Sequence, residues 1–341
     1  MKTIILNEPG SFTLTERDHP GDPSPGEALI KIHRVGICGT DLHAYRGRQP
    51  FFSYPRILGH ELGVEIVALG RDTANLGLTV GDACAIEAYL NCGTCSACRR
   101  GRTNCCESLK VLGVHIDGGM QEYYRLPADK LIKSTLPYEH LATVEMLSIG
   151  AHAVSRAQPQ PDENVLVVGA GPIGLGAIQF ARLTGANVAV MEISPKRMSF
   201  CQENIGIENF INGKSEDVVA NLRSLFGGEL PTTVFDATGN VHSMNNTFNL
   251  VEQAGQIVFI SLVQDNITFF DPEFHRREVT LKSSRNATRQ DFDSVVQALE
   301  EKKIKIEPWI THHATPETML NEFESWLDPE TGVVKAMLAF E

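Results

Sequence analysis

Two side chains of the types that bind zinc lie in the N-terminal part of the sequence. Cys38 and His60 offer a thiolate and an imidazole, and both are preferred zinc ligands. Asp41 follows the cysteine by three residues, so its carboxylate is a candidate hydrogen-bond partner for the far nitrogen of a ligating histidine. Taken alone, Cys38 fits a small buried side chain equally well. Together with the residues described below, the set predicts a catalytic metal centre.

Thr40 and His43 add groups that transfer protons. They stand two and five residues after Cys38. A hydroxyl and an imidazole beside a metal ion can pass a proton from a bound substrate to solvent. We therefore predict that Thr40 and His43 are catalytic.

Five of the eight cysteines crowd between positions 92 and 106. Cys92, Cys95 and Cys98 follow one another at steps of three, and Cys106 lies eight residues further on. Four thiolates at such a spacing can surround one zinc ion and leave no open position, which predicts a structural site in a loop over residues 91–106. Cys105 is an alternative fourth ligand, but the spacing favours Cys106 and we expect Cys105 to point away.

The composition argues against several classes of protein. The chain has 341 residues and a formal net charge of -12, and it shows no cluster of Lys and Arg, so we expect no nucleic-acid partner. No apolar run approaches the roughly 20 residues of a membrane span, and the apolar run at the N-terminus is too short for a signal peptide. These features predict a cytoplasmic protein without membrane contact. In a reducing cytosol, clustered cysteines are more typical of metal binding than of disulfides.

A glycine-rich turn follows a predicted strand near the middle of the chain. Asn164–Val168 has the pattern of a buried strand, and Leu175–Leu183 that of a helix. The residues of the turn that we assign to cofactor binding are Gly169, Gly171, Pro172, Ile173 and Gly174. A G-x-G-x-x-G turn between a strand and a helix lets a pyrophosphate approach the backbone closely. The pattern therefore predicts a dinucleotide-binding site.

A second strand, Asn187–Met191, ends in Glu192, 21 residues after Gly171. A carboxylate there can bind the adenosine ribose diol and would repel a 2′-phosphate, which favours NAD over NADP. Further strands are expected within residues 233–239 and 256–260, and strands that alternate with helices predict a doubly wound parallel sheet. The further cofactor-binding candidates are Thr238, Gly239, Ser261, Leu262 and Val263.

Residues 1 to about 150 contain short β-like runs, such as Glu27–His33 and Gly63–Gly70, which predict a strand-rich domain of partly open barrel type. Leu141–His152 has a helical pattern in which Glu145 is a lone carboxylate. Because an unpaired buried carboxylate is strongly unfavourable, Glu145 either faces solvent or meets a cation. A further helix is expected at about residues 289–303.

With these motifs, the whole chain resembles the zinc-dependent medium-chain dehydrogenase/reductase family. The resemblance implies an α/β protein with a GroES-like catalytic domain at residues 1–150 and 284–341. It also implies a Rossmann domain at residues 151–283, with the active site in the cleft between the two domains. The implied cofactors are two zinc ions per chain and NAD, and the implied assembly is a homo-oligomer, either a dimer or a tetramer.

The resemblance also assigns the third ligand of the catalytic zinc. It implies Glu145 beside Cys38 and His60, as in the polyol dehydrogenases of the family, although Met146 replaces the proline that follows the glutamate in that branch. Glu61 matches a family glutamate that is a possible exchanging ligand. The implied reaction passes a hydride from a secondary alcohol to the nicotinamide ring, and the proton leaves through the Thr40 hydroxyl to His43.

A narrower resemblance points to bacterial dehydrogenases of sugar acids such as L-galactonate and L-gulonate, and to a related starvation-sensing dehydrogenase. The stretches that carry it are Gln49–Pro55, Arg102–Cys106, Leu112–Gly119, Asp236–Asn240, Asp271–His275 and Ser284–Thr288. Arg285 offers a forked donor for a substrate carboxylate or polyol, or alternatively for the cofactor pyrophosphate or a neighbouring carboxylate. His115 is a second candidate for the wall of the substrate site.

The sequence leaves several competing interpretations open. In the first alternative, the protein is a dehydrogenase of the same class, but its substrate is sorbitol, threonine or butanediol. A zinc-free quinone reductase of the same superfamily is disfavoured because Cys38, His60, Glu145 and the four-cysteine loop are all present. A sensor that binds NAD and a metabolite without turnover is disfavoured because Thr40 and His43 are retained beside the candidate ligands.

Overall fold

The chain builds part of a first unit, leaves it to form a second, and then returns to complete the first. In this computed structural model, which describes residues 1–49 and 52–340, unit 1 comprises Met1–Met146 and the stretch from Thr288 onward, and unit 2 comprises Leu147–Ala287. The sequence analysis had set these limits at residues 150/151 and 283/284. Pro50 and Phe51, within the stretch Gln49–Pro55, lie outside the described residues.

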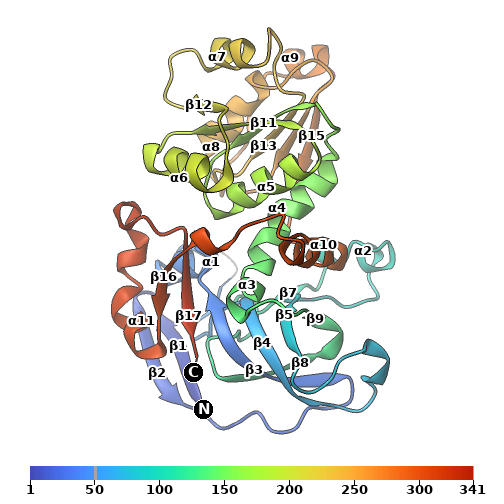
Figure 1. Ribbon diagram of the computed structural model, residues 1–341, viewed down its shortest axis with the longest axis vertical. Coiled ribbons are helices and arrows are strands. Elements are labelled where there is room, and N and C mark those ends of the chain that lie inside the picture. The colour runs from blue at the N-terminus through green and yellow to red at the C-terminus, as the bar shows by residue number, and fades with distance from the viewer. Residues whose placement is uncertain (50–51, 341) are drawn as a thin grey trace. The chain divides into compact units, whose positions relative to one another are not determined.

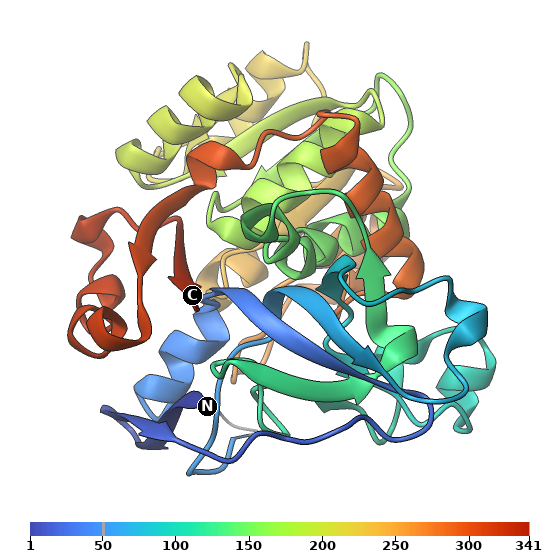
Figure 2. The same cartoon turned by 60° about the horizontal axis from the view of Figure 1, so that its bottom comes forward.

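A seven-stranded sheet organises unit 1 (Figure 2). Its order is β16, β17, β3, β4, β5 and β9, and β8 also pairs with β3. One edge of β3 pairs with β8 over Glu27–Lys31 and with β17 over Arg34–Gly36, while the other edge pairs with β4. The neighbours are antiparallel except β16 and β17, which are parallel. One long strand thus connects the N-terminal part of unit 1 to the segment that returns near residue 335.

The strands of unit 1 are β1 (Lys2–Glu8), β2 (Ser11–Glu16), β3 (Glu27–Gly36), β4 (Glu61–Leu69), β5 (Ala83–Ile86), β6 (Tyr89–Leu90), β7 (Lys110–Val111), β8 (Tyr123–Pro127), β9 (Leu131–Lys133), β16 (Ile310–Ala314) and β17 (Lys335–Ala339). Its helices are α1 (Gly39–Tyr45), α2 (Ser96–Arg99), α3 (Tyr138–Leu141), α10 (Arg289–Glu300) and α11 (Pro316–Glu322). Short 3-10 turns are η1 (Ala74–Leu76), η2 (Thr103–Cys105), η3 (Ala128–Lys130), η5 (Glu307–Trp309), η6 (Ser325–Leu327) and η7 (Pro329–Thr331).

Helix α4 (Val144–Ala157) begins in unit 1 and continues into unit 2. The helical pattern over Leu141–His152 had predicted one element, but α3 ends at Leu141 and α4 starts at Val144. The break coincides with Thr143, whose hydroxyl donates to the carbonyl oxygen of His140 at 2.7 Å. None of the helices within residues 1–49 and 52–340 is long and apolar enough to cross a membrane.

Unit 2 is built on a six-stranded parallel sheet in the order β12, β11, β10, β13, β14 and β15 (Figure 1). Its strands are β10 (Asn164–Val168), β11 (Asn187–Glu192), β12 (Phe210–Asn212), β13 (Thr233–Asp236), β14 (Gln256–Phe259) and β15 (Thr280–Ser283). Its helices are α5 (Pro172–Leu183), α6 (Pro195–Ile205), α7 (Val218–Leu225), α8 (Val241–Asn246) and α9 (Asp271–Arg276), with a 3-10 turn η4 (Thr247–Asn249). Counted within the unit, the order 3-2-1-4-5-6 is that of the Rossmann fold.

The four inner strands of unit 2, β11, β10, β13 and β14, are mostly buried and rich in apolar residues, as expected for a parallel sheet covered on both faces, whereas the edge strand β15 is largely exposed. Val165, Leu166 and Val167 of the first strand are all fully buried. Helices α5, α6 and α7 pack against β10, β11 and β12. The expected strands at 164–168 and 187–191 and the helix at 175–183 therefore appear, with the helix beginning earlier, at Pro172.

Helices α4 and α5 approach each other through glycines. A Cβ atom added at Gly150 would lie 2.4 Å from the backbone nitrogen of Ala177, which is too close for any real contact. A Cβ atom added at Gly176 would have no neighbour nearer than 3.7 Å. The absence of a side chain at Gly150 therefore sets the packing distance, whereas Gly176 has room for a methyl group.

These two positions allow a matched test of this packing. We expect Gly150→Ala to lower the stability of the protein by about 1–3 kcal/mol, the usual effect of overpacking. Gly176→Ala should be neutral or stabilise by up to about 1 kcal/mol, because alanine favours the helix. Thermal and urea unfolding of the two variants measure the difference. Equal midpoints for both variants would contradict the described contact.

Candidate metal centres and cofactor site

Cys38, His60 and Glu61 come together in unit 1. One ligand atom from each lies within 4.8 Å of the other two. In the ladder between β3 and β4, Gly36 pairs with Glu61, so the chain places Cys38 next to His60 just after β3 ends. A Cβ atom at Gly36 would lie 2.2 Å from an oxygen of Glu61, so glycine is needed there for the carboxylate to fit.

The chemistry of this group fits a zinc ion. His60 is buried, and its Nδ1 has no hydrogen-bond partner among the described residues. Although burial lowers the pKa of His60, the Cys38 thiolate, Glu145 and Asp41 raise it well above its usual value. A half-buried sulfur with a buried imidazole nitrogen and a buried carboxylate, in a setting rich in acidic groups, is a suitable zinc donor set.

Asp41 has a different partner from the one expected. Its Oδ2 accepts the backbone N–H of Cys38 at 2.9 Å and closes the first turn of α1. Its Oδ1 has no hydrogen-bond partner within the described part of the chain. In this arrangement Asp41 fixes the backbone of Cys38, and the expected hydrogen bond to the far nitrogen of His60 is not present.

A second carboxylate, Glu145, lies beside the group without belonging to it. The set with donor atoms within 4.8 Å contains Glu61 and not Glu145. Glu145 sits buried in the first turn of α4, where it accepts the hydroxyl of Tyr89 and its charge acts on His60. Burial raises the pKa of the Glu145 carboxyl. The structure thus offers two carboxylates at one centre, one inside the donor set and one next to it.

Lys335, which the sequence analysis missed, is the cation of this centre. Its Nζ lies 2.8 and 2.7 Å from the two oxygens of Glu61 and donates to the carbonyl oxygen of Ile37 at 2.9 Å. The lysine side chain is 2 % exposed. Burial opposes its charge, but Glu61 and the Cys38 thiolate raise the pKa of Lys335 above its ordinary value. The available sequence signal was a single lysine within the apolar run Val333–Leu338.

Thr40 and His43 lie three residues apart on helix α1, so they share one of its faces. The backbone N–H of Thr40 points to the sulfur of Cys38 at 3.5 Å. His43 is exposed, and partial burial of its ring together with Arg46 and Arg48 lowers its pKa. The imidazole is therefore neutral over a wider pH range than a free histidine and can accept a proton.

The second metal-ligand group is the predicted cysteine set. The sulfurs of Cys92, Cys95, Cys98 and Cys106 lie within 4.8 Å of one another. Cys105 is exposed and is not part of the group. The hydroxyl and backbone of Thr94 and the N–H of Cys95 lower the pKa of the Cys92 thiol to about 6. A short helix, α2, lies inside this segment, which the sequence analysis had treated as a loop.

The cofactor candidates of unit 2 follow the carboxyl ends of parallel strands and therefore share one edge of the sheet. Gly169, Thr238, Ser261 and Arg285 come after β10, β13, β14 and β15. A Cβ atom at Gly169 would lie 3.1 Å from Thr238, and one at Gly239 would lie 3.7 Å from Ser261, so the neighbouring turns abut. This edge is where α/β sheets bind their ligands.

The glycine turn, residues 169–174, leaves open space beside its backbone at Gly171. Gly169 has φ of 92°, and a Cβ atom at Gly174 would lie 1.9 Å from the carbonyl oxygen of Gly169, so both positions need glycine. A Cβ atom at Gly171 would meet only Arg197, at 3.8 Å. Pro172 and Ile173 begin α5 immediately afterwards. The open face at Gly171 and the start of α5 fit a dinucleotide pyrophosphate.

Glu192 ends β11 and is buried. One carboxylate oxygen accepts the N–H of Ala170 at 2.8 Å, and the other accepts those of Ile193 and Ser194 at 2.7 and 2.9 Å. The side chain thus joins the glycine turn to the turn after β11. Arg197 is 3.9 Å away.

The remaining candidates differ in exposure. Arg285 is exposed just after β15, and Leu262 is 69 % exposed. Ser261 and Val263 flank Leu262 in the turn that follows β14. His115 accepts the N–H of Val111 on its Nδ1 at 3.1 Å, so it helps to close its own turn.

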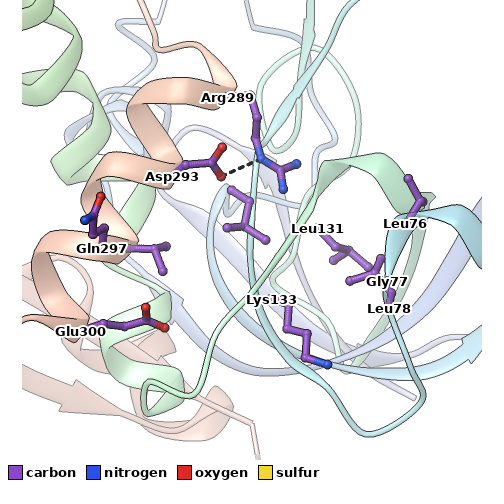
Figure 3. A pocket seen from close by; sticks show the side chains of 11 residues that line it. Leu76, Gly77, Leu78, Leu131, Lys133, Arg289, Asp293, Gln297 and Glu300 are labelled. Atoms are coloured by element: carbon purple, nitrogen blue, oxygen red, sulfur yellow. Dashed lines mark hydrogen bonds and ion pairs between the residues drawn. The ribbon is translucent and has the colours of Figure 1, made fainter.

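A pocket of about 380 Å³ lies between α10, β9 and the turn after η1 (Figure 3). Its charged side chains are already paired. Arg289 binds Asp293, with 2.9 Å between Nε and Oδ1. The other two charged lining residues have partners that do not line the pocket: Lys133 pairs with Asp82, and Glu300 accepts a hydrogen bond from the hydroxyl of Ser134. None of its lining residues belongs to either metal-ligand group. The pocket therefore offers no set of converging polar groups for catalysis.

Comparisons with known proteins agree with this geometry. Residues 24–137 match the alcohol dehydrogenase GroES-like domain, and residues 172–301 match the zinc-binding dehydrogenase domain. The chain is 43% identical over 341 residues to L-galactonate-5-dehydrogenase of Escherichia coli strain K12, covering 100% of this chain and 99% of that protein. It is 32% identical over 273 residues to sorbitol dehydrogenase of Bacillus subtilis, covering 78% and 76%.

A solved structure is similar over the same length. The crystal structure of the alcohol dehydrogenase RspB from E. coli CFT073, complexed with NADH, superposes with a TM-score of 0.92 at 30% sequence identity and covers 100% of this chain and 99% of that one. With both domain matches, the two ligand groups and the Rossmann strand order, this chain belongs to the zinc-binding dehydrogenases that carry a GroES-like domain, the medium-chain dehydrogenase/reductase family.

Proposed function

We propose that this protein is a zinc-dependent dehydrogenase that oxidises a secondary alcohol of a sugar acid or polyol and reduces NAD. The observation that carries the proposal is the grouping of Cys38, His60 and Glu61 in a chain that also has a separate four-cysteine group. The full-length similarity to L-galactonate-5-dehydrogenase supports L-galactonate and L-gulonate as the first substrates to test.

The two ligand groups have different roles in this proposal. Cys38 and His60 with one carboxylate form a three-ligand set that leaves a position for substrate, which is the pattern of catalytic zinc. The family resemblance favours Glu145 as the third ligand, whereas the geometry favours Glu61, and exchange between the two carboxylates accommodates both. The four cysteines, Cys92, Cys95, Cys98 and Cys106, form a closed and therefore structural set.

When bound, zinc supplies a Lewis acid at the substrate hydroxyl and NAD accepts the hydride. The chain itself positions these groups and moves the proton. Thr40 receives the proton on its hydroxyl and passes it to His43, which is neutral and exposed and releases it to solvent. Gly169–Gly174 and Glu192 hold the dinucleotide, aided by Thr238, Gly239 and the residues Ser261 to Val263.

Alcohols other than sugar acids are also candidate substrates and should be assayed alongside them. Sorbitol, threonine and butanediol are alcohols of related dehydrogenases, and the sorbitol enzyme of B. subtilis is one of the relatives. A cytoplasmic homo-oligomer, dimer or tetramer, is the assembly that we propose. A cluster of four thiolates supports a reducing compartment, because oxidation would remove its ligands.

The first prediction concerns metal content. Protein purified without chelators should contain two zinc ions per chain by mass spectrometry. Cys38→Ser should remove one ion and abolish turnover, because the catalytic set loses its only thiolate. Cys95→Ser should remove the other ion and chiefly lower the unfolding temperature. Finding one ion or none in the unaltered protein would refute the two-site assignment.

The second prediction concerns the cofactor. kcat/KM should be much higher with NAD than with NADP, since the Glu192 carboxylate repels a 2′-phosphate. Glu192→Gln keeps the size of the side chain and removes its charge. It should therefore lower the ratio of kcat/KM with NAD to kcat/KM with NADP. The control is Glu203→Gln, an exposed glutamate on α6, which should leave the ratio unchanged. A preference of the unaltered protein for NADP would exclude Glu192 from the ribose site.

The third prediction concerns substrate class and Arg285. A panel of sugar acids and polyols, followed by NADH absorbance, should give the highest kcat/KM with a hexonate. If Arg285 binds the carboxylate, Arg285→Ala should weaken turnover of the acid relative to a neutral polyol of the same length by at least about tenfold, since a charged hydrogen bond contributes about 1.5–3 kcal/mol.

Arg276→Ala is the matched control, because Arg276 is an exposed arginine of the same unit that pairs with Glu273. Equal losses on acid and polyol in Arg285→Ala would assign Arg285 to the cofactor. Turnover of sorbitol with none of any sugar acid would place the enzyme with the ordinary polyol dehydrogenases.

A further inference from the structure

A short segment of unit 1, Glu87–Asn91, reaches both metal-ligand groups. We call it the bridging segment. At its centre is Tyr89 of β6, which is 2 % exposed and donates its hydroxyl to Glu145. The Tyr89 ring packs edge-on against Phe292 of α10, with centroids 5.8 Å apart and an angle of 69°. The hydroxyl therefore has a fixed direction toward the carboxylate.

At its C-terminal end the bridging segment touches the four-cysteine group. The side-chain amide of Asn91 donates to the sulfur of Cys98 at 3.7 Å. The next residue, Cys92, belongs to the group itself, and its backbone N–H points to the sulfur of Cys106 at 3.3 Å. Asn91 and the residue after it thus contact the sulfurs of Cys98 and Cys106.

A buried lysine fastens the bridging segment along its length. The Nζ of Lys130 donates to Glu87 and to Asn91, each at 2.9 Å. Glu87 also donates its backbone N–H to the carbonyl oxygen of Lys130 at 2.8 Å. Lys130 and Glu87 are 7% and 4% exposed. A buried charge pair of this kind resists displacement, because moving one partner leaves the other uncompensated.

Strand pairing by itself holds the segment only weakly. β6 and β7 share just two residue pairs, Tyr89 with Val111 and Leu90 with Lys110. The carbonyl oxygen of Ala88 also accepts the N–H of Leu112 at 3.1 Å, and the Tyr89 ring packs on Phe292. The contacts of the segment with Lys130 and with the cysteine group add to these and fix its two ends.

We infer that Tyr89 is a positioning residue for Glu145, and that the bridging segment makes this position depend on the four-cysteine group. The inference rests on the proposed binding of zinc at both groups. When the four sulfurs hold an ion, Asn91 and Cys92 are fixed and the Tyr89 hydroxyl is aimed at Glu145. When they do not, Lys130 alone holds the C-terminal end of the segment, and the Tyr89 hydroxyl is aimed at Glu145 less firmly. The structural ion thereby supports the catalytic one.

The first arm of the test is Tyr89→Phe, which removes the hydroxyl and keeps the packing of the ring. Zinc retention at the catalytic centre, measured by competition with a chromophoric chelator, should weaken roughly 10- to 100-fold, as for other residues that orient a ligand. The visible spectrum of Co(II)-substituted protein identifies the affected site, because a centre with one thiolate absorbs more weakly than one with four. Tyr124→Phe, on β8 of the same unit, is the control and should change neither measurement.

The second arm is Asn91→Ala, alone and combined with Tyr89→Phe. By itself it should weaken zinc retention at both centres. In the Tyr89→Phe background it should no longer affect the catalytic centre, because both changes act through the same hydroxyl, and a double-mutant cycle measures this non-additivity.

Each outcome bears on the inference. Unchanged retention and an unchanged cobalt spectrum in Tyr89→Phe would overturn the positioning role. An Asn91→Ala effect on the catalytic centre that is absent, or that is equal in both backgrounds, would overturn the link between the groups. A wild-type protein that binds two ions and turns over substrate keeps the proposed function intact in either case. A wild-type protein without zinc would instead refute the proposed function.

Discussion

Negative charge is crowded into the interior of unit 1, and the ion pair between Lys335 and Glu61 is the interaction that makes this arrangement stable. Cys38, Asp41 and Glu145 surround the same pair. An isolated buried carboxylate is strongly unfavourable, and breaking a buried pair by removing one partner typically costs about 3–5 kcal/mol. Lys335 supplies the permanent positive charge, and a divalent cation supplies the rest when it binds.

The two carboxylates of the centre are held in different ways, and this gives them different properties. Glu61 shares its charge with an ammonium group that contacts both of its oxygens. Glu145 accepts the neutral hydroxyl of Tyr89 and lies near the charges of His60 and Lys335. Because Lys335 already compensates Glu61, that carboxylate can leave a metal ion without becoming an unpaired charge. This difference supports the exchange between the two carboxylates that we propose.

The parts of the site that the sequence predicted are those whose chemistry is local. The four cysteines lie within fifteen positions and the glycine turn within six, so their spacing alone defines a geometry. The parallel sheet of unit 2 also follows from the alternation of strands and helices, whereas its strand order is seen only in the structure. The short helix α2 inside the cysteine segment and the break between α3 and α4 depend on single hydrogen-bonded turns, which periodicity does not resolve.

The parts that the sequence did not predict come from contacts between distant positions. Lys335 lies 274 residues from Glu61, and Tyr89 lies 56 from Glu145. Lys130 looks like an ordinary surface lysine after Asp129, yet it is buried against Glu87. Asp41 was expected to bind His60, but the start of α1 turns its carboxylate to the backbone of Cys38. Only the folded sheet brings these partners together.

The return of the chain to unit 1 has a consequence for biosynthesis. A ribosome adds roughly 5–20 residues per second, so Lys335 emerges on the order of tens of seconds after Glu61, from which 274 residues separate it. Unit 2 is one continuous stretch and can fold during that interval. The nascent first unit meanwhile carries Cys38 and the carboxylates of the centre without the lysine cation that will face them. Strand β17 brings that cation as it inserts between β16 and β3, so the acidic centre is neutralised late, after the nucleotide-binding part of the chain has already been made.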